Sequence, residues 1–181
     1  MLYSFDEKTP IVDDETYVSE TAIVIGDVKI GKNCYIGHGA IIRGDYGRIE
    51  IGNETSIEEG VVIHAPPNEV CFIGNGVIIG HGAIIHAKKI NDNVVIGMGA
   101  ILSFWSEIGE GSIVAEGSIV TKNQNIESNV VAAGHPAKKI REVSEKEKEF
   151  WEEARKRYVK LAQKCKEGCI KRIPSPIFKL V

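Results

Sequence analysis

Three histidines stand at a spacing that could hold a metal ion: His64, His81 and His86. Neutral imidazole nitrogen is a good ligand for zinc and other transition metals. Three such ligands leave one position of a tetrahedral ion open for water, which is the arrangement of catalytic zinc sites. The chemistry to consider is therefore the activation of water by a metal ion. One histidine alone would be weak evidence, and what matters is whether the fold brings the three together.

An aliphatic residue recurs at every sixth position along most of the chain, from Ile30 to Ile126. A period of six matches neither an α-helix nor simple strand alternation. It is typical of hexapeptide repeats, in which each hexad forms one short strand and one corner of a parallel β-helix. Three hexads make one triangular coil, and we expect about six to seven coils. Inserts at residues 42–51 and 63–73 interrupt the period, and we expect both to form loops beside the third face of the prism.

The repeat predicts which inward-pointing side chains stack over one another. The first face has Ile30, Ile51, Ile73, Ile90, Ile108 and Ile126, the second has Val18, Ile36, Ile57, Ile79, Ile96, Val114 and Ala132, and the third has Val24, Ile42, Ile63, Ile85, Leu102 and Val120. On the third face, the position after the stacked residue holds Arg43, His64 and His86 in successive coils. Because neighbouring strands lie about 4.8 Å apart, the two imidazoles can bind one ion.

His81 cannot complete this site within the same chain. It lies five residues before His86 and around a corner, so the extended chain separates the two by about 10–16 Å. A three-histidine site therefore requires a second copy of the prism, and a closed ring of three copies meets this requirement. The same register predicts that Glu59 of one copy meets Arg43 of the next, while Asp45 orients the guanidinium within its own chain.

The motifs around these residues resemble the γ-class carbonic anhydrase family. The matching stretches are Arg43-Gly44-Asp45, residues 56–64 and residues 79–86, and the similarity runs on through residues 133–138 and the C-terminal helix. The resemblance implies a left-handed β-helix, a homotrimer and three metal sites between subunits.

The resemblance also implies roles for single residues. His64 and His86 would ligate the metal from one subunit and His81 from its neighbour, and Arg43 and Asp45 would form a structural ion pair. The implied reaction is the reversible hydration of carbon dioxide to bicarbonate by metal-bound hydroxide. Zinc, iron(II) and cobalt all accept imidazole, and zinc is the expected cofactor.

The chain departs from the family near the expected metal. Glu58 and Glu59 stand where active members usually carry Gln-Asp, and Tyr46 stands where the prototype has a glutamate. Glu59 preserves the charge that faces the arginine, whereas Glu58 replaces a neutral donor with an acceptor. The prototype has a long acidic loop that carries a proton-shuttling glutamate. This chain has only a short segment, residues 65–72, in its place. Glu58 and Glu69 are the candidates for the catalytic proton relay.

Three hypotheses for function remain open at this point. The first is a metal-dependent carbonic anhydrase. The second is a hexapeptide-repeat acyltransferase that uses acetyl-CoA, which would need one catalytic base but no set of three histidines. The third is a metal-binding trimer without catalysis, or a relative that hydrolyses thioesters. We interpret His38 and His135 as ordinary surface histidines, and Cys34 and Cys71 as small buried hydrophobic residues.

The C-terminal region has a different period. Ser144 and Glu147 predict a capping box, and apolar residues at helical spacing predict a helix over about residues 145–167, long enough to lie along the prism. We therefore divide the chain into a β-helix domain, 1–140, and a helix with a tail, 141–181, packed on it. A net charge of −3 offers no basic surface for nucleic acid. Without an apolar signal core or a spanning run, we expect no membrane partner and a cytoplasmic location.

Overall fold

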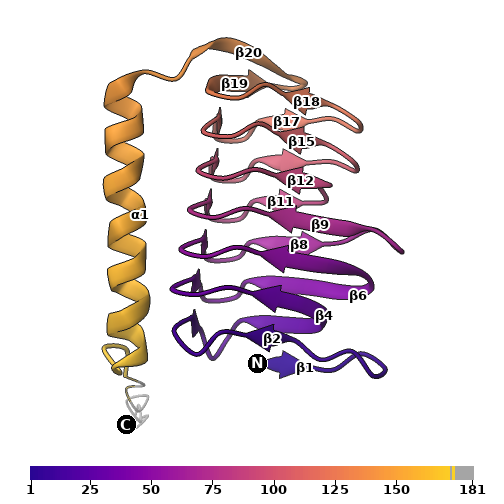
Figure 1. Ribbon diagram of the computed structural model, residues 1–181, viewed down its shortest axis with the longest axis vertical. Coiled ribbons are helices and arrows are strands. Elements are labelled where there is room, and N and C mark those ends of the chain that lie inside the picture. Colours follow the sequence, from indigo (N-terminus) through magenta and orange to yellow (C-terminus); the bar gives the residue numbers. More distant parts are fainter. Residues whose placement is uncertain (172, 174–181) are drawn as a thin grey trace, which may run out of the picture.

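The computed structural model describes residues 1–171 and 173, so most of the predicted tail lies outside the described residues. About seven coils stack into a left-handed parallel β-helix, and one helix, α1 (Glu145–Lys166), runs alongside it (Figure 1). The N-terminus lies at the base of the stack, and β20 crosses its top. This architecture confirms the predicted fold class.

Two sheets form the three faces of the prism. The 8-stranded sheet is the second face, in the spatial order β20 (Ala137–Glu142), β19 (Val130–Gly134), β16 (Ile113–Val114), β13 (Val95–Ile96), β10 (Ile78–Ile79), β7 (Ser56–Ile57), β5 (Tyr35–Ile36) and β3 (Tyr17–Val18). The 12-stranded sheet covers the other two faces, in the order β17 (Ile119–Val120), β14 (Ile101–Leu102), β11 (Ile84–Ile85), β8 (Val62–His64), β6 (Ile41–Ile51), β9 (Val70–Ile73), β12 (Lys89–Ile90), β15 (Glu107–Ile108) and β18 (Asn125–Ile126). Next to β6 lies β4 (Ile23–Ile30), which also pairs with β1 (Leu2–Tyr3) and β2 (Ile11–Val12).

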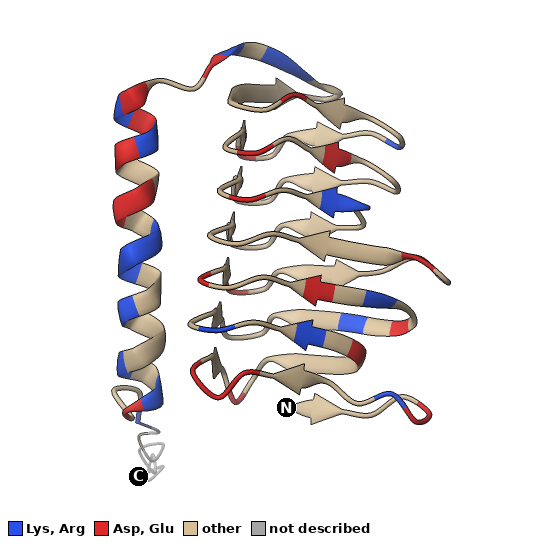
Figure 2. Cartoon of the chain, in the orientation of Figure 1, with Lys and Arg blue, Asp and Glu red and all other residues tan. Residues whose placement is uncertain are grey.

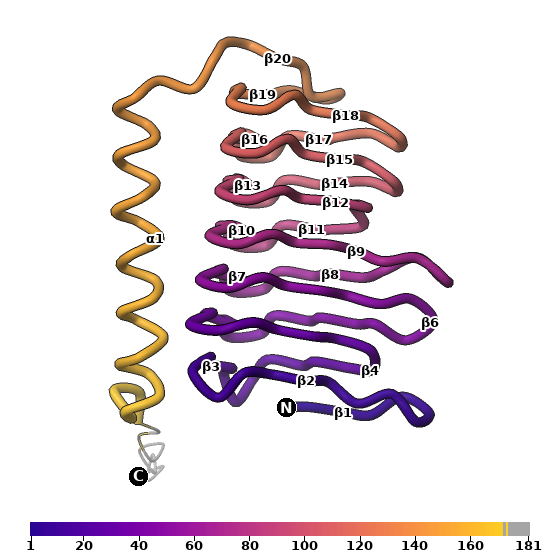
Figure 3. The backbone as a smooth tube through the Cα atoms, in the orientation of Figure 1, coloured from indigo at the N-terminus to yellow at the C-terminus, as the bar shows by residue number. Residues whose placement is uncertain are grey.

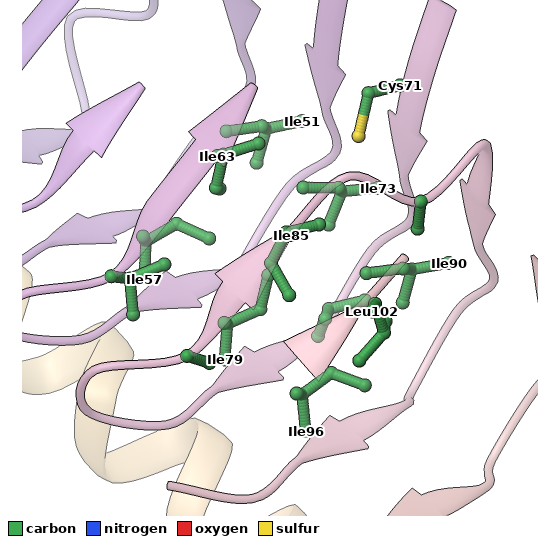
Figure 4. Packing of buried hydrophobic residues seen from close by; sticks show 14 of the residues in the cluster. Ile51, Ile57, Ile63, Cys71, Ile73, Ile79, Ile85, Ile90, Ile96 and Leu102 are labelled. Carbon is green, nitrogen blue, oxygen red and sulfur yellow. The ribbon is translucent and has the colours of Figure 1, made fainter. Parts of the chain in front are cut away.

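All three predicted columns are present in the strand register. On the third face, for example, Ile85 pairs with Ile63 in the coil before and with Leu102 in the coil after. Figure 4 shows these side chains meeting those of the other two faces in the interior of the prism. The stacked residues are almost all β-branched and almost all buried, and no coil could bury its inner face without the coils beside it.

The first insert does not form the expected loop. Residues 42–51 belong to β6, which continues as one extended strand from the third face to the first. The reason is pairing on both sides, because β4 crosses the same corner as an extended strand and β9 pairs with the second half of β6. The second insert does leave the stack, as a turn over residues 65–69 before β9 (Figure 3).

Helix α1 begins and ends where the sequence predicts. The Ser144 hydroxyl accepts from the Glu147 amide, and the Glu147 carboxylate accepts from the Ser144 amide. The helix packs Leu161, Ala162 and Cys165 against the lower coils of the second face. The strand before it, β20, ends at Glu142, so the sheet extends past the boundary that we placed at residue 140.

Charges of both signs are mixed along α1 and along the visible strands of the prism (Figure 2). No helix within the described residues is both long and apolar enough to span a lipid bilayer.

Truncation of a stacked side chain tests the core. We expect Ile108→Ala to destabilise the protein by about 2–5 kcal/mol, because it removes buried methyl groups and leaves a cavity between two coils. Lys29→Ala, on an exposed position of β4, is the control and should change stability by less than about 0.5 kcal/mol. Thermal unfolding at one fixed protein concentration measures both, and equal midpoints for the two variants would contradict the stacked core.

Candidate metal centre

His64 and His86 form a pair on the third face. His64 ends β8 and His86 follows β11, and these strands pair in register, so the two side chains leave neighbouring coils at the same point. The Nδ1 atom of His64 lies 3.0 Å from Nε2 of His86. Two nitrogens bound to one tetrahedral zinc ion are about 3.4 Å apart, given bonds of about 2.0–2.1 Å. The two rings are therefore close to the separation that a shared metal ion requires.

A carboxylate stands behind His64. Its Nε2 atom lies 3.1 Å from Oδ1 of Asp45, which is only 5% exposed. The other oxygen of Asp45 pairs with the Arg43 guanidinium from the same strand. Burial alone would raise the pKa of Asp45, but the Tyr46 amide, His64 and Arg43 together lower it below its usual value. Such a carboxylate fixes the ring orientation and the tautomer of a metal-binding histidine.

One ring nitrogen of His86 has no partner among the residues that the structure describes. Its Nδ1 atom is buried and makes no hydrogen bond, which is unusual for a buried polar group. The Phe104 ring packs on the imidazole, with centroids 4.3 Å apart. Burial, and then the charges of His64 and Arg43, lower the pKa of His86. The two facing nitrogens share at most one hydrogen bond, and both are placed so that one cation can replace it.

His81 lies at a different corner, directly after β10, and its side chain is half exposed. Its Nδ1 atom lies 2.8 Å from Oε2 of Glu59, and its Nε2 atom lies 3.0 Å from Oε2 of Glu58. In the described part of the chain, no three His, Cys, Asp or Glu side chains converge as metal ligands. A site with all three histidines therefore needs another copy of the chain.

The two carboxylates at His81 are held by further groups. Glu58 is buried and also accepts the backbone amide of His81 at 3.1 Å. Glu59 accepts the Tyr35 hydroxyl at 2.7 Å through its other oxygen. Burial would raise the pKa of Glu59, but the Tyr35 hydrogen bond, its own backbone amide and nearby histidine charge lower it. Within one chain, Glu59 thus contacts His81 rather than Arg43.

Glu69 lies apart from both histidine groups among the described contacts. It is exposed on the turn before β9, where its amide donates to the Pro66 carbonyl. The carboxylate of Glu107 and, more weakly, that of Glu69 raise the pKa of Lys88. The two predicted relay residues are therefore at separate corners of one chain, Glu58 beside His81 and Glu69 just beyond His64.

Sequence reasoning missed three aromatic residues of these sites: Tyr35, Phe104 and Tyr158. The repeat held a signal for the first two. Tyr35 precedes a stacked residue and therefore points outward, and Phe104 follows the position one coil above His86. Tyr158 comes from α1, where burial and the Glu58 carboxylate raise the pKa of its hydroxyl. The six-residue period contains no information about how this helix docks.

The outward face of the third-face strands is apolar from bottom to top. The residue before each stacked residue is aliphatic in every coil: Ile23, Ile41, Val62, Ile84, Ile101 and Ile119. Ile41 is 36% exposed and Ile84 is 42% exposed. The second face has α1 over it, and the first face carries Lys, Glu and Asn at most of these positions. The other four are partly exposed, so the strip is an apolar surface of the kind that interaction sites commonly have.

Comparisons with known proteins identify the family. No family model matches the chain. A carbonic anhydrase from Geobacillus kaustophilus is 36% identical to it over 163 residues, which cover 90% of each chain. The chain belongs to the γ-class carbonic anhydrase family. Within this family, gamma carbonic anhydrase 2 of Arabidopsis thaliana, named as mitochondrial, is 36% identical over 87% of this chain but only 59% of its own length. The carnitine operon protein CaiE of Proteus sp. is 32% identical over 96% of this chain and 88% of its own.

Solved structures show the same hexapeptide-repeat fold. A putative acetyltransferase from Bacillus cereus has a TM-score of 0.90 at 32% identity and covers 92% of this chain and 97% of its own. A hexapeptide transferase family protein from Anaplasma phagocytophilum has a TM-score of 0.86 at 34% identity, over 91% and 97% of the two chains. The similar proteins thus carry names of two kinds, carbonic anhydrase and acyltransferase, although they share one fold.

Metal content tests the three histidines of this γ-class carbonic anhydrase family member. We expect His64→Ala, His86→Ala and His81→Ala each to abolish stoichiometric metal binding, although His81 lies at a different corner from the other two, because an ion held by three ligands loses most of its affinity with any one of them. His38→Ala should keep full metal content, since His38 bonds to Ser19 and Thr21 at another position. Elemental analysis of purified protein gives the result, and full metal content in His81→Ala would rule out the site between copies.

Proposed function

We propose that this protein catalyses the reversible hydration of carbon dioxide to bicarbonate at metal sites between the subunits of a homotrimer. The observation that carries the proposal is the His64–His86 pair, with facing nitrogens 3.0 Å apart and the Asp45 carboxylate behind one of them. Its place in a chain 36% identical to a carbonic anhydrase over 90% of both lengths supports this reaction.

The proposed metal is zinc, or iron(II) or cobalt, held by His64 and His86 of one copy and His81 of the next. When bound, such an ion supplies the Lewis acidity that makes water a nucleophile near neutral pH. Asp45 keeps His64 in one tautomer, and Glu59 has the same role at His81. Phe104 adds an apolar wall beside His86, and an apolar wall suits carbon dioxide, which carries no charge.

Proton removal is assigned to two carboxylates. Glu58 is buried against the His81 ring, where a general base must lie close to the reacting water. Glu69, exposed beyond His64, passes the proton to solvent. The register brings these residues of different copies to one site if His81 of one copy meets the His64–His86 pair of the next.

The homotrimer is supported by the apolar strip on the third face. The aliphatic outward residues of that face, among them Ile41 and Ile84, lack a covering element within the described chain. In the proposed assembly they meet the His81 corner of a second copy, which places Glu59 opposite Arg43. A cytoplasmic location remains a prediction, and two of the relatives are named as mitochondrial.

Acyl transfer from acetyl-CoA is the second candidate, and the acetyltransferase name of the Bacillus cereus protein favours it. A metal-binding trimer without catalysis, or a thioester hydrolase, is the third. Acyl transfer gives no role to three histidines with carboxylates behind two of them. Incubation with acetyl-CoA and assay of free thiol release, with and without metal, would detect the second activity and thioester hydrolysis.

Stopped-flow hydration of carbon dioxide tests the proposed reaction. Zinc- or iron-loaded protein should accelerate hydration, and metal-free protein should not. Glu58→Ala should lower the rate about 10²-fold, a typical loss for a general base, while metal content is unchanged. Glu110→Ala, on an exposed turn, is the control. Loaded wild-type protein without hydration activity would leave a metal-binding trimer as the function.

Charge on the apolar strip tests the trimer. Ile84→Asp should separate the copies and remove bound metal with them, because an unpaired carboxylate would be buried in the interface. Lys89→Asp, at the corresponding outward position of the first face in the same coil, should change neither property. Light scattering coupled to gel filtration, followed by elemental analysis, measures both, and a trimeric Ile84→Asp variant would show that this face is not the interface.

A further inference from the structure

Glu59 is anchored through both carboxylate oxygens. Oε2 lies 2.8 Å from Nδ1 of His81, and Oε1 accepts the Tyr35 hydroxyl at 2.7 Å. A carboxylate held at one oxygen can still turn about its last bond, but a second close polar contact at the other oxygen restricts that rotation. The direction in which Glu59 holds the His81 ring therefore depends on where the Tyr35 hydroxyl lies.

Tyr35 is itself buried in a cluster of packed side chains. It is 5% exposed and lies between two other tyrosine rings under α1. The Tyr17 ring stacks on it with centroids 5.6 Å apart and an interplanar angle of 24°. The Tyr158 ring, from α1, lies 5.6 Å away on a tilt of 43°. Ala162 and Cys165 of the same helix belong to this cluster.

Packing alone does not account for the hydroxyl group of Tyr35. A phenylalanine ring would fill the same space between Tyr17 and Tyr158, and a buried hydroxyl costs free energy unless it is hydrogen-bonded. The one side-chain acceptor that the described structure gives to Tyr35 is Glu59. Burial and the Glu59 hydrogen bond both raise the pKa of Tyr35, so the phenol stays protonated and remains a donor.

The surroundings of His64 and His81 are built in the same way. Behind His64 stands Asp45, and behind Asp45 stands the Arg43 guanidinium. Behind His81 stands Glu59, and behind Glu59 stands the Tyr35 hydroxyl. Each imidazole is oriented by a carboxylate that a buried or paired donor holds in place.

We propose that Tyr35 is a positioning residue for the metal ligand His81, acting through Glu59, with α1 holding its ring. This rests on the proposed metal site. When Nδ1–H of His81 faces Glu59, the ion binds the other ring nitrogen, Nε2, which lies 3.0 Å from Glu58 in the single chain. Loss of the Tyr35 hydroxyl removes one of the contacts that hold the Glu59 carboxylate, and His81 is then held less firmly in the orientation that binds the ion.

Cobalt(II) binding to the full-length chain tests this role. Tyr35→Phe should weaken cobalt affinity about tenfold or more, as loss of an outer partner of a metal ligand commonly does, and should shift the visible absorption spectrum of the bound ion. Tyr17→Phe is the matched control, from the same tyrosine cluster but without a bond to Glu59, and should bind like wild type. Competition with a chelator gives the affinities, and gel filtration and thermal unfolding of metal-free protein show whether each variant keeps its assembly and fold.

A second variant separates positioning from a general loss of structure. In a Glu59→Gln background, Tyr35→Phe should have little further effect, because both changes act on one interaction. An equal loss in both backgrounds, or a Tyr35→Phe variant that binds cobalt within twofold of wild type, overturns the role of Tyr35 alone. Wild-type protein that binds no cobalt overturns the metal site of the proposed function, and the role of Tyr35 with it.

Discussion

The register between coils is the constraint on which the whole molecule depends. Each stacked aliphatic residue pairs with its counterpart one coil away, and the backbone hydrogen bonds fix neighbouring strands about 4.8 Å apart. The same spacing is imposed on whatever side chains point outward. His64 and His86 are brought together because Ile63 and Ile85 must stack, and the distance between their nitrogens follows from the core rather than from any attraction between the rings.

This arrangement explains how a rigid scaffold can hold incompletely satisfied polar groups. Two imidazoles that share at most one hydrogen bond, and one buried nitrogen without a partner among the described residues, are unfavourable by themselves. They persist because the surrounding coils are over-determined by a continuous β-branched core. The Asp45 carboxylate orients the His64 ring, and the Glu59 carboxylate orients the His81 ring at another corner.

The sequence was sufficient for the parts of the structure that the period controls. It predicted the three columns, the neighbouring positions of Arg43, His64 and His86, the stacking of His81 over Glu59, and both ends of α1. It failed where pairing partners outside the period decide the conformation. The insert at residues 42–51 became strand because β4 and β9 satisfy its backbone on both edges. The partners of Glu59 and Glu58 could not be foreseen either, because Tyr35 and Tyr158 meet only after α1 docks, and the lateral position of a helix on a sheet depends on side-chain packing.

The docking of α1 also has a consequence for biosynthesis. The helix leaves the ribosome after the coils that it covers, from β3 to β7. The tyrosine cluster under the helix therefore stays incomplete while most of the prism is already formed. The groups that hold the His81 corner are therefore completed only once the helix has been synthesised and has docked on coils that are already folded.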